Sequence, residues 1–250
     1  MYGHRPELRE LPPDDLAPVV EWDDFARYVF GWQQGEHVGL IGPTGSGKST
    51  MTYAILPMRR YVTFFATKPK DPTLEAFARK GGYQRIPDWP PKTRLGRPVS
   101  AEDMPRRLLW PDASTIGAVS RQQAVFRRAI ADIYGQGGWS VVFDEFWMMN
   151  SILELEDESR ILLQQARSND ISFVMGAQRP SRIPLELFDQ ATHLMFWRDN
   201  DERNLTRMSG IGWLAAGPIR AFVANLEPHQ VLYVNTRSGD MYRTTAPEIA

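Results

Sequence analysis

Residues 37–50 read HVGLIGPTGSGKST, an apolar segment that runs into a glycine-rich turn. His37 to Ile41 is short and apolar enough for a buried strand, and Ser49 to Leu56 can form a helix. The glycines therefore lie at a strand-to-helix turn, which is the context in which the pattern G-x-x-x-x-G-K-[ST] binds phosphate. The alternative is a glycine-rich turn that contains Lys-Ser by chance, but here every position of the motif is filled. The stretch predicts a nucleotide phosphate site.

Each residue type in this loop has a physical role. Glycine permits positive φ angles and close approach, so that backbone N–H groups can surround an anion at a helix N-terminus. The Lys48 ammonium is expected to reach the β- and γ-phosphates of ATP, and the Ser49 hydroxyl is expected to bind Mg²⁺. The predicted nucleotide-binding residues are Gly42, Pro43, Thr44, Gly45, Ser46, Gly47, Lys48, Ser49 and Thr50.

The composition is that of an ordinary globular protein. The 250 residues are 42% hydrophobic and 24% charged, which suits a single domain spanning residues 1–250 with residues 1–36 as a lead-in. There is no cysteine, which excludes a disulfide framework and fits a reducing cytoplasm. No apolar run is long enough to span a membrane. With a net charge of −1, any nucleic-acid binding must come from a local patch or from a ring of subunits.

Apolar segments alternate with segments of helical periodicity along the chain. Expected strands cover residues 60–66, 108–110, 139–143, 171–177 and 193–197, and expected helices cover 22–32, 120–134, 151–166, 185–190 and 201–208. Such alternation predicts an α/β fold with a mostly parallel central sheet and helices on both faces. Residues 219–223 and 231–234 are expected to form a C-terminal β-hairpin that closes at 225–230.

Polar residues follow two of the expected strands. Asp144 and Glu145 end the segment WSVVF, and Gln178 ends the next strand. Parallel strands place their carboxyl ends at one edge, so these side chains are expected to lie beside the phosphate loop. Asp144 is the expected Mg²⁺ ligand with Ser49, and Glu145 the residue that orients or deprotonates the attacking water. An acidic helix cap is the alternative for this pair.

Three stretches resemble the HerA/FtsK superfamily of DNA-pumping ATPases. GPTGSGKST, VVFDEFWMM and ARSNDISFVMGAQRPS look like the Walker A, Walker B and strand-four motifs of that superfamily. THLMFWRDNDERNLTRMSG is similar to the segment that follows, and ATKPKD looks like a degenerate DPKG-type motif of conjugative coupling ATPases. The resemblance covers about residues 37 to 210. The sequence differs from the superfamily pattern at two points. It has Asn169-Asp170 where many relatives have a glycine before the isoleucine, and it has GAQRP where relatives have TQRP.

The resemblance implies a RecA-like (ASCE) P-loop NTPase with ATP sites between the subunits of a homo-hexamer or other ring, and double-stranded DNA driven through the pore. It assigns phosphate, magnesium, water and sensor roles to Lys48, Ser49, Asp144, Glu145 and Gln178. Arg167 matches the family's intersubunit arginine, ahead of Arg179, Arg203 and Arg207. The chain shows neither the membrane helices nor the extra domains of the larger motors. It therefore looks most like the viral genome-packaging ATPases, which implies capsid portal or membrane-vertex proteins as partners.

Two function classes remain after comparison with other P-loop proteins. An LSGGQ-like signature and an NKxD motif are absent from the sequence, which argues against ABC subunits and GTPases. One class is a DNA-translocating ATPase. The other is a conjugative-coupling or zonula-occludens-toxin-like secretion or assembly ATPase that acts with a membrane partner. Stimulation of hydrolysis by DNA separates the two.

Residues 79–107 are rich in proline, glycine and arginine and are expected to form a basic surface insertion. If DNA is the cargo, this insertion is the expected contact, with Tyr83 and Trp89 between the charges. A solvated surface loop, or a face that docks a portal protein, is the alternative. The candidate DNA-binding residues are Arg79, Lys80, Arg85, Lys92, Arg94 and Arg97, together with Arg106 and Arg107.

Overall fold

The computed structural model describes residues 14–180, 183, 185–208 and 216–247. Within them one sheet has the strand order β3-β4-β2-β5-β6-β1-β7-β8-β9. All neighbours from β3 to β7 pair in parallel, whereas β7–β8 and β8–β9 are antiparallel. The strands are β1 (His37–Ile41), β2 (Val62–Phe65), β3 (Gln84–Ile86), β4 (Arg106–Leu109), β5 (Ser140–Phe143), β6 (Ser172–Ala177), β7 (Ala191–Trp197), β8 (Gln230–Asn235) and β9 (Met241–Thr245).

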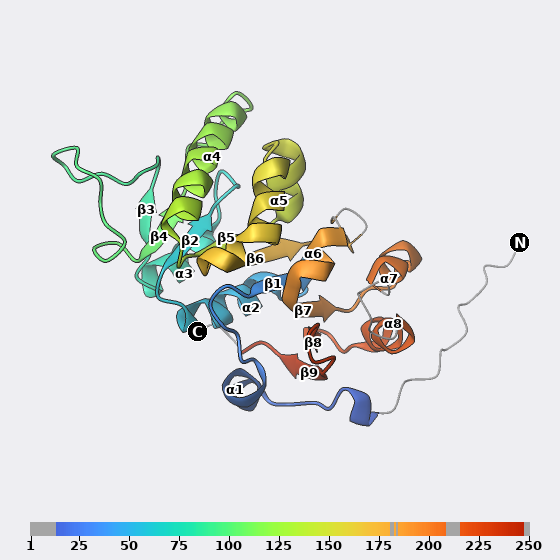
Figure 1. The fold of residues 1–250 in the computed structure, drawn as a ribbon. Helices are drawn as coiled ribbons and strands as arrows, with labels where there is room; N and C mark the ends of the chain where they lie inside the picture. Colours follow the sequence, from blue (N-terminus) through green and yellow to red (C-terminus); the bar gives the residue numbers. More distant parts are fainter. Residues whose placement is uncertain (1–13, 181–182, 184, 209–215, 248–250) are drawn as a thin grey trace, which may run out of the picture.

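Helices connect the parallel strands and cover the sheet (Figure 1). The α-helices are α1 (Trp22–Asp24), α2 (Lys48–Ile55), α3 (Pro72–Lys80), α4 (Ala118–Gln136), α5 (Glu156–Gln165), α6 (Leu185–Gln190), α7 (Glu202–Met208) and α8 (Ala216–Asn225). Short 3₁₀ or π segments are η1 (Asp14–Leu16), η2 (Phe25–Val29), η3 (Leu56–Met58), η4 (Met148–Ile152) and η5 (Ala166–Asn169). The resulting mixed α/β fold confirms the predicted fold class.

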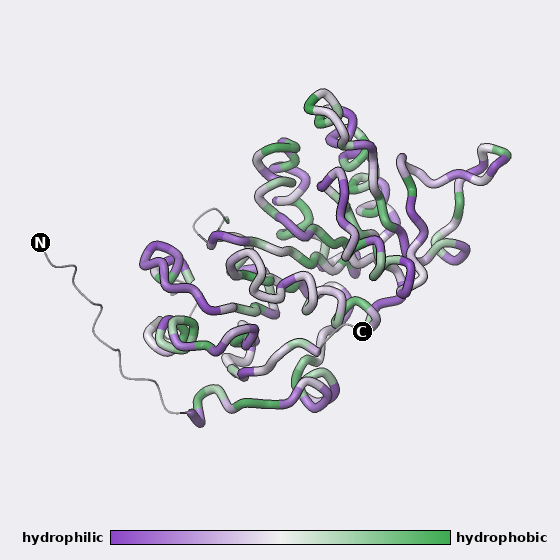
Figure 2. The backbone as a smooth tube through the Cα atoms, turned by 180° about the vertical axis from the view of Figure 1, so that it is seen from behind, coloured by the Kyte–Doolittle hydropathy of each residue, from purple (hydrophilic) through white to green (hydrophobic). Residues whose placement is uncertain are grey.

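Buried residues divide into two clusters, one on each face of the sheet. Along β5, Val141 packs with the cluster that includes α4, α5, α7 and α8, whereas Val142 packs with the cluster that includes η2, α2 and α3. Phe65 and Phe64 of β2 divide in the same way. Strands buried on both faces read as continuous apolar runs, as these do. In Figure 2 the hydrophobic colour follows the central strands, while α4 and α5 alternate between hydrophobic and hydrophilic residues.

The order of the strands positions the candidate site. β1 lies between β6 and β7, and β5 lies between β2 and β6. The parallel direction brings the carboxyl ends of β1, β2, β5 and β6 to one edge. Gly42, Asp144 and Gln178 follow three of these ends, as predicted.

The C-terminal region differs from the prediction in one element. The β-hairpin is present, but its strands are β8 and β9, and residues 219–223 belong to α8 instead of a strand. Ile219, Phe222 and Val223 are buried at i, i+3 and i+4, the spacing of one helix face. Pro218 lies near the start of this helix, where proline is tolerated.

Residues 79–107 contain more regular structure than the prediction of a surface insertion allowed. Both β3 and β4 lie within or at the end of this stretch and extend the sheet beyond β2. Tyr83, Trp89 and Arg107 are buried, so they do not present the surface that was expected for DNA. Arg107 donates to three main-chain carbonyls and lies over the ring of Trp139 at 4.5 Å. The basic surface is confined to the rest of the stretch.

Candidate nucleotide-binding site

The loop between β1 and α2 adopts the conformation that its glycines allow. Gly45 and Gly47 have φ angles of 78° and 112°, which only glycine adopts without strain. Gly42 has a different requirement, because a Cβ there would come within 2.6 Å of the Trp197 Cβ. The Gly42 N–H donates to the carbonyl of Ala177 at 3.0 Å, which fixes the start of the loop against β6.

Lys48 begins α2 and turns its side chain back into the loop. The buried ammonium donates to the carbonyls of Gly42 at 2.6 Å and Pro43 at 2.8 Å. Burial lowers the pKa of Lys48, while the carboxylates of Asp144 and Glu145 act in the opposite direction. A buried cation whose bonded partners among the described residues are main-chain carbonyls is well placed to bind an anion such as a phosphate.

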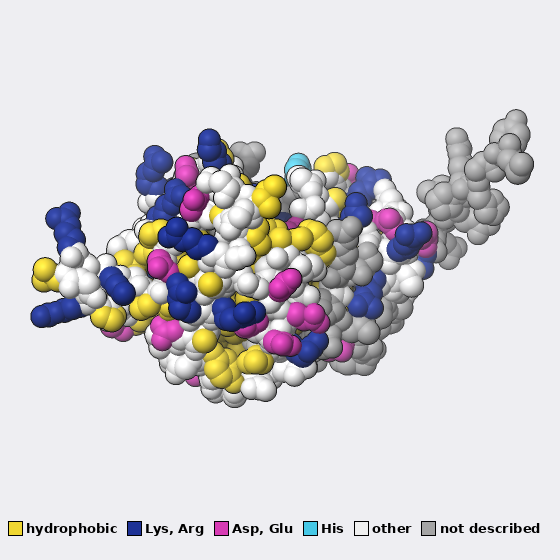
Figure 3. Space-filling view, turned by 90° about the horizontal axis from the view of Figure 1, so that it is seen from above, with side chains coloured by type: hydrophobic (Ala, Val, Ile, Leu, Met, Phe, Trp, Pro, Cys, Tyr) yellow, Lys and Arg dark blue, Asp and Glu magenta, His cyan; other side chains and the backbone are white. Residues whose placement is uncertain are grey.

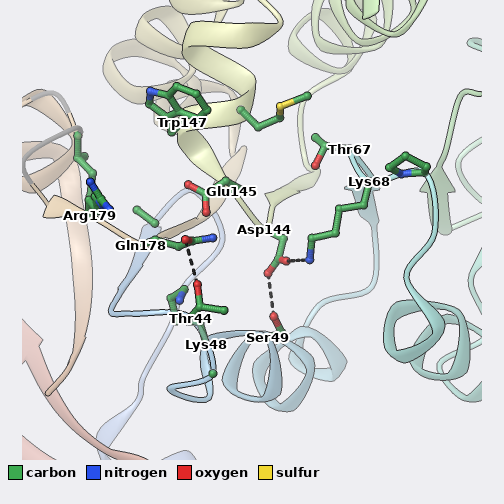
Figure 4. Close-up of a pocket in the computed structure, with 15 residues that line it drawn as sticks. Thr44, Lys48, Ser49, Thr67, Lys68, Asp144, Glu145, Trp147, Gln178 and Arg179 are labelled. Carbon is green, nitrogen blue, oxygen red and sulfur yellow. Dashed lines mark hydrogen bonds and ion pairs between the residues drawn. The ribbon is translucent and has the colours of Figure 1, made fainter. Parts of the chain in front are cut away.

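Ser49 and Asp144 bring two hard oxygen donors together. The Ser49 hydroxyl donates to Oδ1 of Asp144 at 3.1 Å, which joins the start of α2 to the end of β5. Hydroxyl and carboxylate oxygens are the ligands that Mg²⁺ prefers. The pair therefore fits the predicted magnesium role, with both oxygens facing the same hollow in Figure 4.

Lys68 is a site residue that the sequence analysis did not single out. It follows β2, and its ammonium lies 3.4 Å from Oδ2 of Asp144 and 3.1 Å from Asp71. Burial lowers the pKa of Lys68, but the two carboxylates outweigh this and raise it. The signal in the sequence was the polar string ATKPKD directly after a strand, which marks another carboxyl end at the same edge.

Glu145 and Gln178 form the other side of the site (Figure 4). Burial raises the pKa of the Glu145 carboxyl, whereas Lys48 and a hydrogen bond from the Gln178 amide lower it. The Thr44 hydroxyl donates to Oε1 of Gln178 at 3.0 Å, which leaves the amide NH₂ group to face Glu145. The amide thus connects the phosphate loop to the carboxylate.

These side chains surround a hollow of about 490 Å³. Its volume is in the range of small-molecule sites. In the phosphate loop, Ser46 Oγ is buried and has no hydrogen-bond partner among residues 14–180, 183, 185–208 and 216–247, so it is a further polar group suited to a phosphate oxygen. Residues of this hollow outside the motif include Thr67, Lys68, Trp147, Met148, Arg179 and Ile183.

The four candidate arginines lie in different places. Arg179 lines the hollow, and Arg207 donates to the carbonyl of Ile183 at 2.8 Å. Arg203 is exposed on α7. Arg167 lies in η5 next to Gly35, at the amino-terminal edge of the sheet, opposite the edge that carries the phosphate loop. Its guanidinium therefore cannot complete the site of its own subunit.

The candidate DNA-binding residues are mostly exposed, on two parts of the surface. Arg79 and Lys80 end α3, and Arg85 on β3 pairs with Glu75 at 3.4 Å. Lys92, Arg94 and Arg97 lie on the loop between β3 and β4. This loop projects from the body in Figure 1, and Figure 3 shows Lys and Arg side chains gathered at that end.

The loop tip has a defined turn. Thr93 and Arg97 are joined by a main-chain hydrogen bond of 2.8 Å, and Lys92 forms a β-bridge with Pro98. Leu95 at the tip is 85% exposed. The turn therefore holds Arg94 and Arg97 together, away from the sheet.

None of the helices in the described part of the chain has the length and apolar character needed to cross a membrane. No protein-family model matches the sequence, and no curated protein matches it either.

Solved structures do match the fold. The chain is similar to B204, the DNA-packaging ATPase of Sulfolobus turreted icosahedral virus, with a TM-score of 0.59 and 12% identity over 87% of this chain and 100% of that one. The B204 packaging NTPase of Sulfolobus turreted icosahedral virus 2, in complex with ATPγS, matches with a TM-score of 0.57 and 12% identity over 88% and 100% of the two chains.

A third similar structure is the cytoplasmic domain of the type VII secretion ATPase EccC from Thermomonospora curvata. Its TM-score is 0.56 at 12% identity, over 87% of this chain and 26% of that one. These neighbours have the P-loop ATPase fold that the resemblance to the HerA/FtsK superfamily implies.

Proposed function

We propose that this chain is an ATP-hydrolysing double-stranded DNA translocase that packages a viral genome into a capsid and works as a ring with ATP sites between subunits. The observation that carries the enzymatic part is the meeting of Lys48, the Ser49–Asp144 pair and the Glu145–Gln178 pair around one hollow. The choice of a packaging motor is supported by the similarity to B204 over the whole of that chain.

Each residue has a distinct part in hydrolysis. Lys48 and the loop N–H groups bind the phosphates, and Ser49 with Asp144 would hold Mg²⁺, which supplies Lewis-acid stabilisation of the phosphoryl charge. Glu145 orients the attacking water or accepts a proton from it. Burial raises the pKa of Glu145 overall, the direction that suits a proton acceptor, and the Gln178 amide opposes this rise. The same amide can donate to the water or the γ-phosphate without adding charge.

The turn between β3 and β4 is the proposed contact with DNA. Arg94 and Arg97 are exposed on a turn that its own main-chain hydrogen bonds hold in shape. Arginine contacts with phosphates do not depend on base sequence, which suits a motor that must move along any sequence.

A secretion or assembly ATPase is the second candidate. The similarity to EccC, a secretion ATPase, favours it. In that case the cargo or partner is a protein, and the exposed turn would dock that protein instead of DNA.

The deciding experiment is steady-state ATP hydrolysis with and without long double-stranded DNA, at low and moderate salt. We expect DNA to stimulate hydrolysis and salt to remove the stimulation, since phosphate contacts weaken steeply with salt. Glu145→Gln, which is expected to bind ATP without turning it over, is the blank. Hydrolysis that ignores DNA at every salt concentration would favour the secretion or assembly class.

The turn is tested by the double variant Arg94→Gln/Arg97→Gln. At moderate salt this variant is expected to bind DNA about ten-fold more weakly or worse, because two phosphate contacts are removed. Its basal hydrolysis is expected to stay unchanged. Arg127→Gln/Arg160→Gln, which removes two half-exposed arginines from α4 and α5, is the matched control. Equal DNA affinity in both double variants would exclude the turn as the contact.

A further inference from the structure

A second hollow lies on the other side of the phosphate loop. It measures about 770 Å³ and lies between α2, α3, the end of β9 and the turn before β8. Its lining residues are Gly47, Ser49, Thr50, Tyr53, Thr73, Ala76, Phe77, Lys80, His229, Thr245, Ala246 and Pro247. The hydrolytic site described above leaves this hollow unused.

The two hollows meet at the start of α2. Ser49 lines both of them, whereas Gly47 and Thr50 line only the second. Figure 4 shows Glu145 and Gln178 across the first hollow from Ser49. A triphosphate whose terminal phosphate lies between Lys48 and Glu145 must therefore continue toward Thr50, which leads into the second hollow.

The walls of the second hollow suit a flat aromatic ring. Phe77 of α3 is half-buried and stacks on Tyr53 of α2, with ring centroids 4.1 Å apart and planes 10° from parallel. Ala246 and Pro247 add apolar surface. Stacking on aromatic side chains is how proteins hold nucleobases without reading their edges.

Polar groups lie around these apolar walls. Thr73 and Thr245 line the hollow, and their hydroxyls are groups that can bond to ribose or base edges. The His229 ring lines it as well, with Nδ1 3.3 Å from the carbonyl of Ser46 in the phosphate loop. This contact connects the wall of the second hollow directly to the loop that binds phosphate.

We infer that the second hollow holds the purine base and ribose of the nucleotide whose phosphates bind at Lys48, with the base packed against Phe77. The inference rests on the proposed ATPase function and adds the nucleoside half of the site. Four segments far apart in the sequence build it, namely α2, α3, the turn that carries His229 and the C-terminal residues 245–247. Binding of the base therefore joins the C-terminal end of the described chain to the phosphate loop.

The test compares ATP with inorganic tripolyphosphate, which has the phosphates but no base, by titration calorimetry in the Glu145→Gln background. Phe77→Ala is expected to weaken ATP binding by about ten-fold, the cost of losing one stacking partner, while tripolyphosphate binding is unchanged. Unchanged tripolyphosphate binding also shows that the variant is folded.

Ala76→Trp is the second variant, because it fills the hollow without removing the Phe77 ring. It is expected to weaken ATP binding and to spare tripolyphosphate. Glu75→Trp places the same side chain on the same helix at a position that does not line the hollow, and it should change neither affinity. If both hollow variants leave the ratio of the two affinities unchanged, the base does not bind here. If the background protein binds neither ligand, the proposed nucleotide site itself is wrong, which is a separate result.

Discussion

Gly176 gives the sharpest test of how the sheet positions the two carboxylates that we propose act in hydrolysis. It lies in β6, beside the residues that follow β5. A Cβ at this position would overlap the carbonyl oxygen of Asp144 and come within 2.9 Å of its carbonyl carbon. The substitution Gly176→Ala therefore pushes directly on the main chain that carries Asp144 and Glu145.

The size of the effect follows from this overlap. The Asp144 main chain must move by about 1 Å to restore van der Waals separation, and overpacking of this kind costs about 1–3 kcal/mol of stability. A displacement of about 1 Å at reacting groups lowers rates by about a hundred-fold. We therefore expect kcat to fall by about that factor. ATP binding without Mg²⁺ is expected to persist, since Lys48 and its loop belong to another segment.

The assay is steady-state hydrolysis with a thermal melt on the same samples. Gly135→Ala is the control, because it lies in α4 with no atom within 4 Å of the added Cβ and without a positive φ. That variant should keep its rate and gain up to about 1 kcal/mol of stability from helix propensity. A Gly176→Ala protein with normal kcat would refute the idea that close packing of β6 on Asp144 sets the catalytic geometry.

Three further predictions concern stability and assembly. Burial lowers the pKa of His37 to about 4, and its Nδ1 accepts a hydrogen bond from the Phe173 N–H. As the pH falls below 6.5, the unfolded chain therefore takes up a proton at His37 before the folded chain does. The free energy of unfolding, measured in urea titrations, should fall between pH 6.5 and 4 by up to about 3 kcal/mol. His37→Asn should lessen this fall, and an unaltered pH profile would contradict the assignment. Arg107→Met should cost about 2–4 kcal/mol in the same titrations, because three main-chain carbonyls lose their donor; a cost near zero would contradict this. Arg167→Ala should leave an isolated subunit unaffected and impair a ring. If the arginine acts in trans, mixing Arg167→Ala with Lys48→Ala subunits should restore part of the hydrolysis, although a ring of either variant alone is inactive.

The strands and long helices could be predicted where the apolar pattern was long or fully buried. WSVVF and the segment of α4 were placed correctly because burial on both faces, or along one helical stripe, repeats over many residues. Residues 219–223 were assigned to the wrong class, since a short apolar run suits a strand and a buried helix equally well. β3 was missed because its residues QRI are only partly buried, and pairing with β4 alone makes them a strand.

The phosphate side of the site could be predicted because its parts follow local rules. A glycine-rich turn after a strand, and acidic or amide residues after other strands, all converge once the strands are parallel. Lys68 follows β2 and obeys the same rule, so the polar string after that strand was a usable signal. The hollow beside Phe77 could not be found in this way, since it depends on which helices cover that face of the sheet and on where the C-terminal strand ends. The basic residues of the proline-rich stretch led to one wrong prediction, that Arg107 faces solvent and contacts DNA. Arg107 is buried among main-chain carbonyls.

The position of Arg167 restricts how subunits could share a site. The phosphate loop lies at the carboxyl edge of the sheet, and Arg167 lies at the amino edge beside Gly35. A two-fold dimer places identical surfaces together. It could bring Arg167 of one copy to Lys48 of the other only if the amino and carboxyl edges of both copies lay in the same interface. A head-to-tail contact has no such requirement, because the amino edge of one copy meets the carboxyl edge of the next. Such contacts close into rings when the rotation between copies allows it. An arginine that acts in trans therefore favours a ring over a dimer on geometric grounds alone.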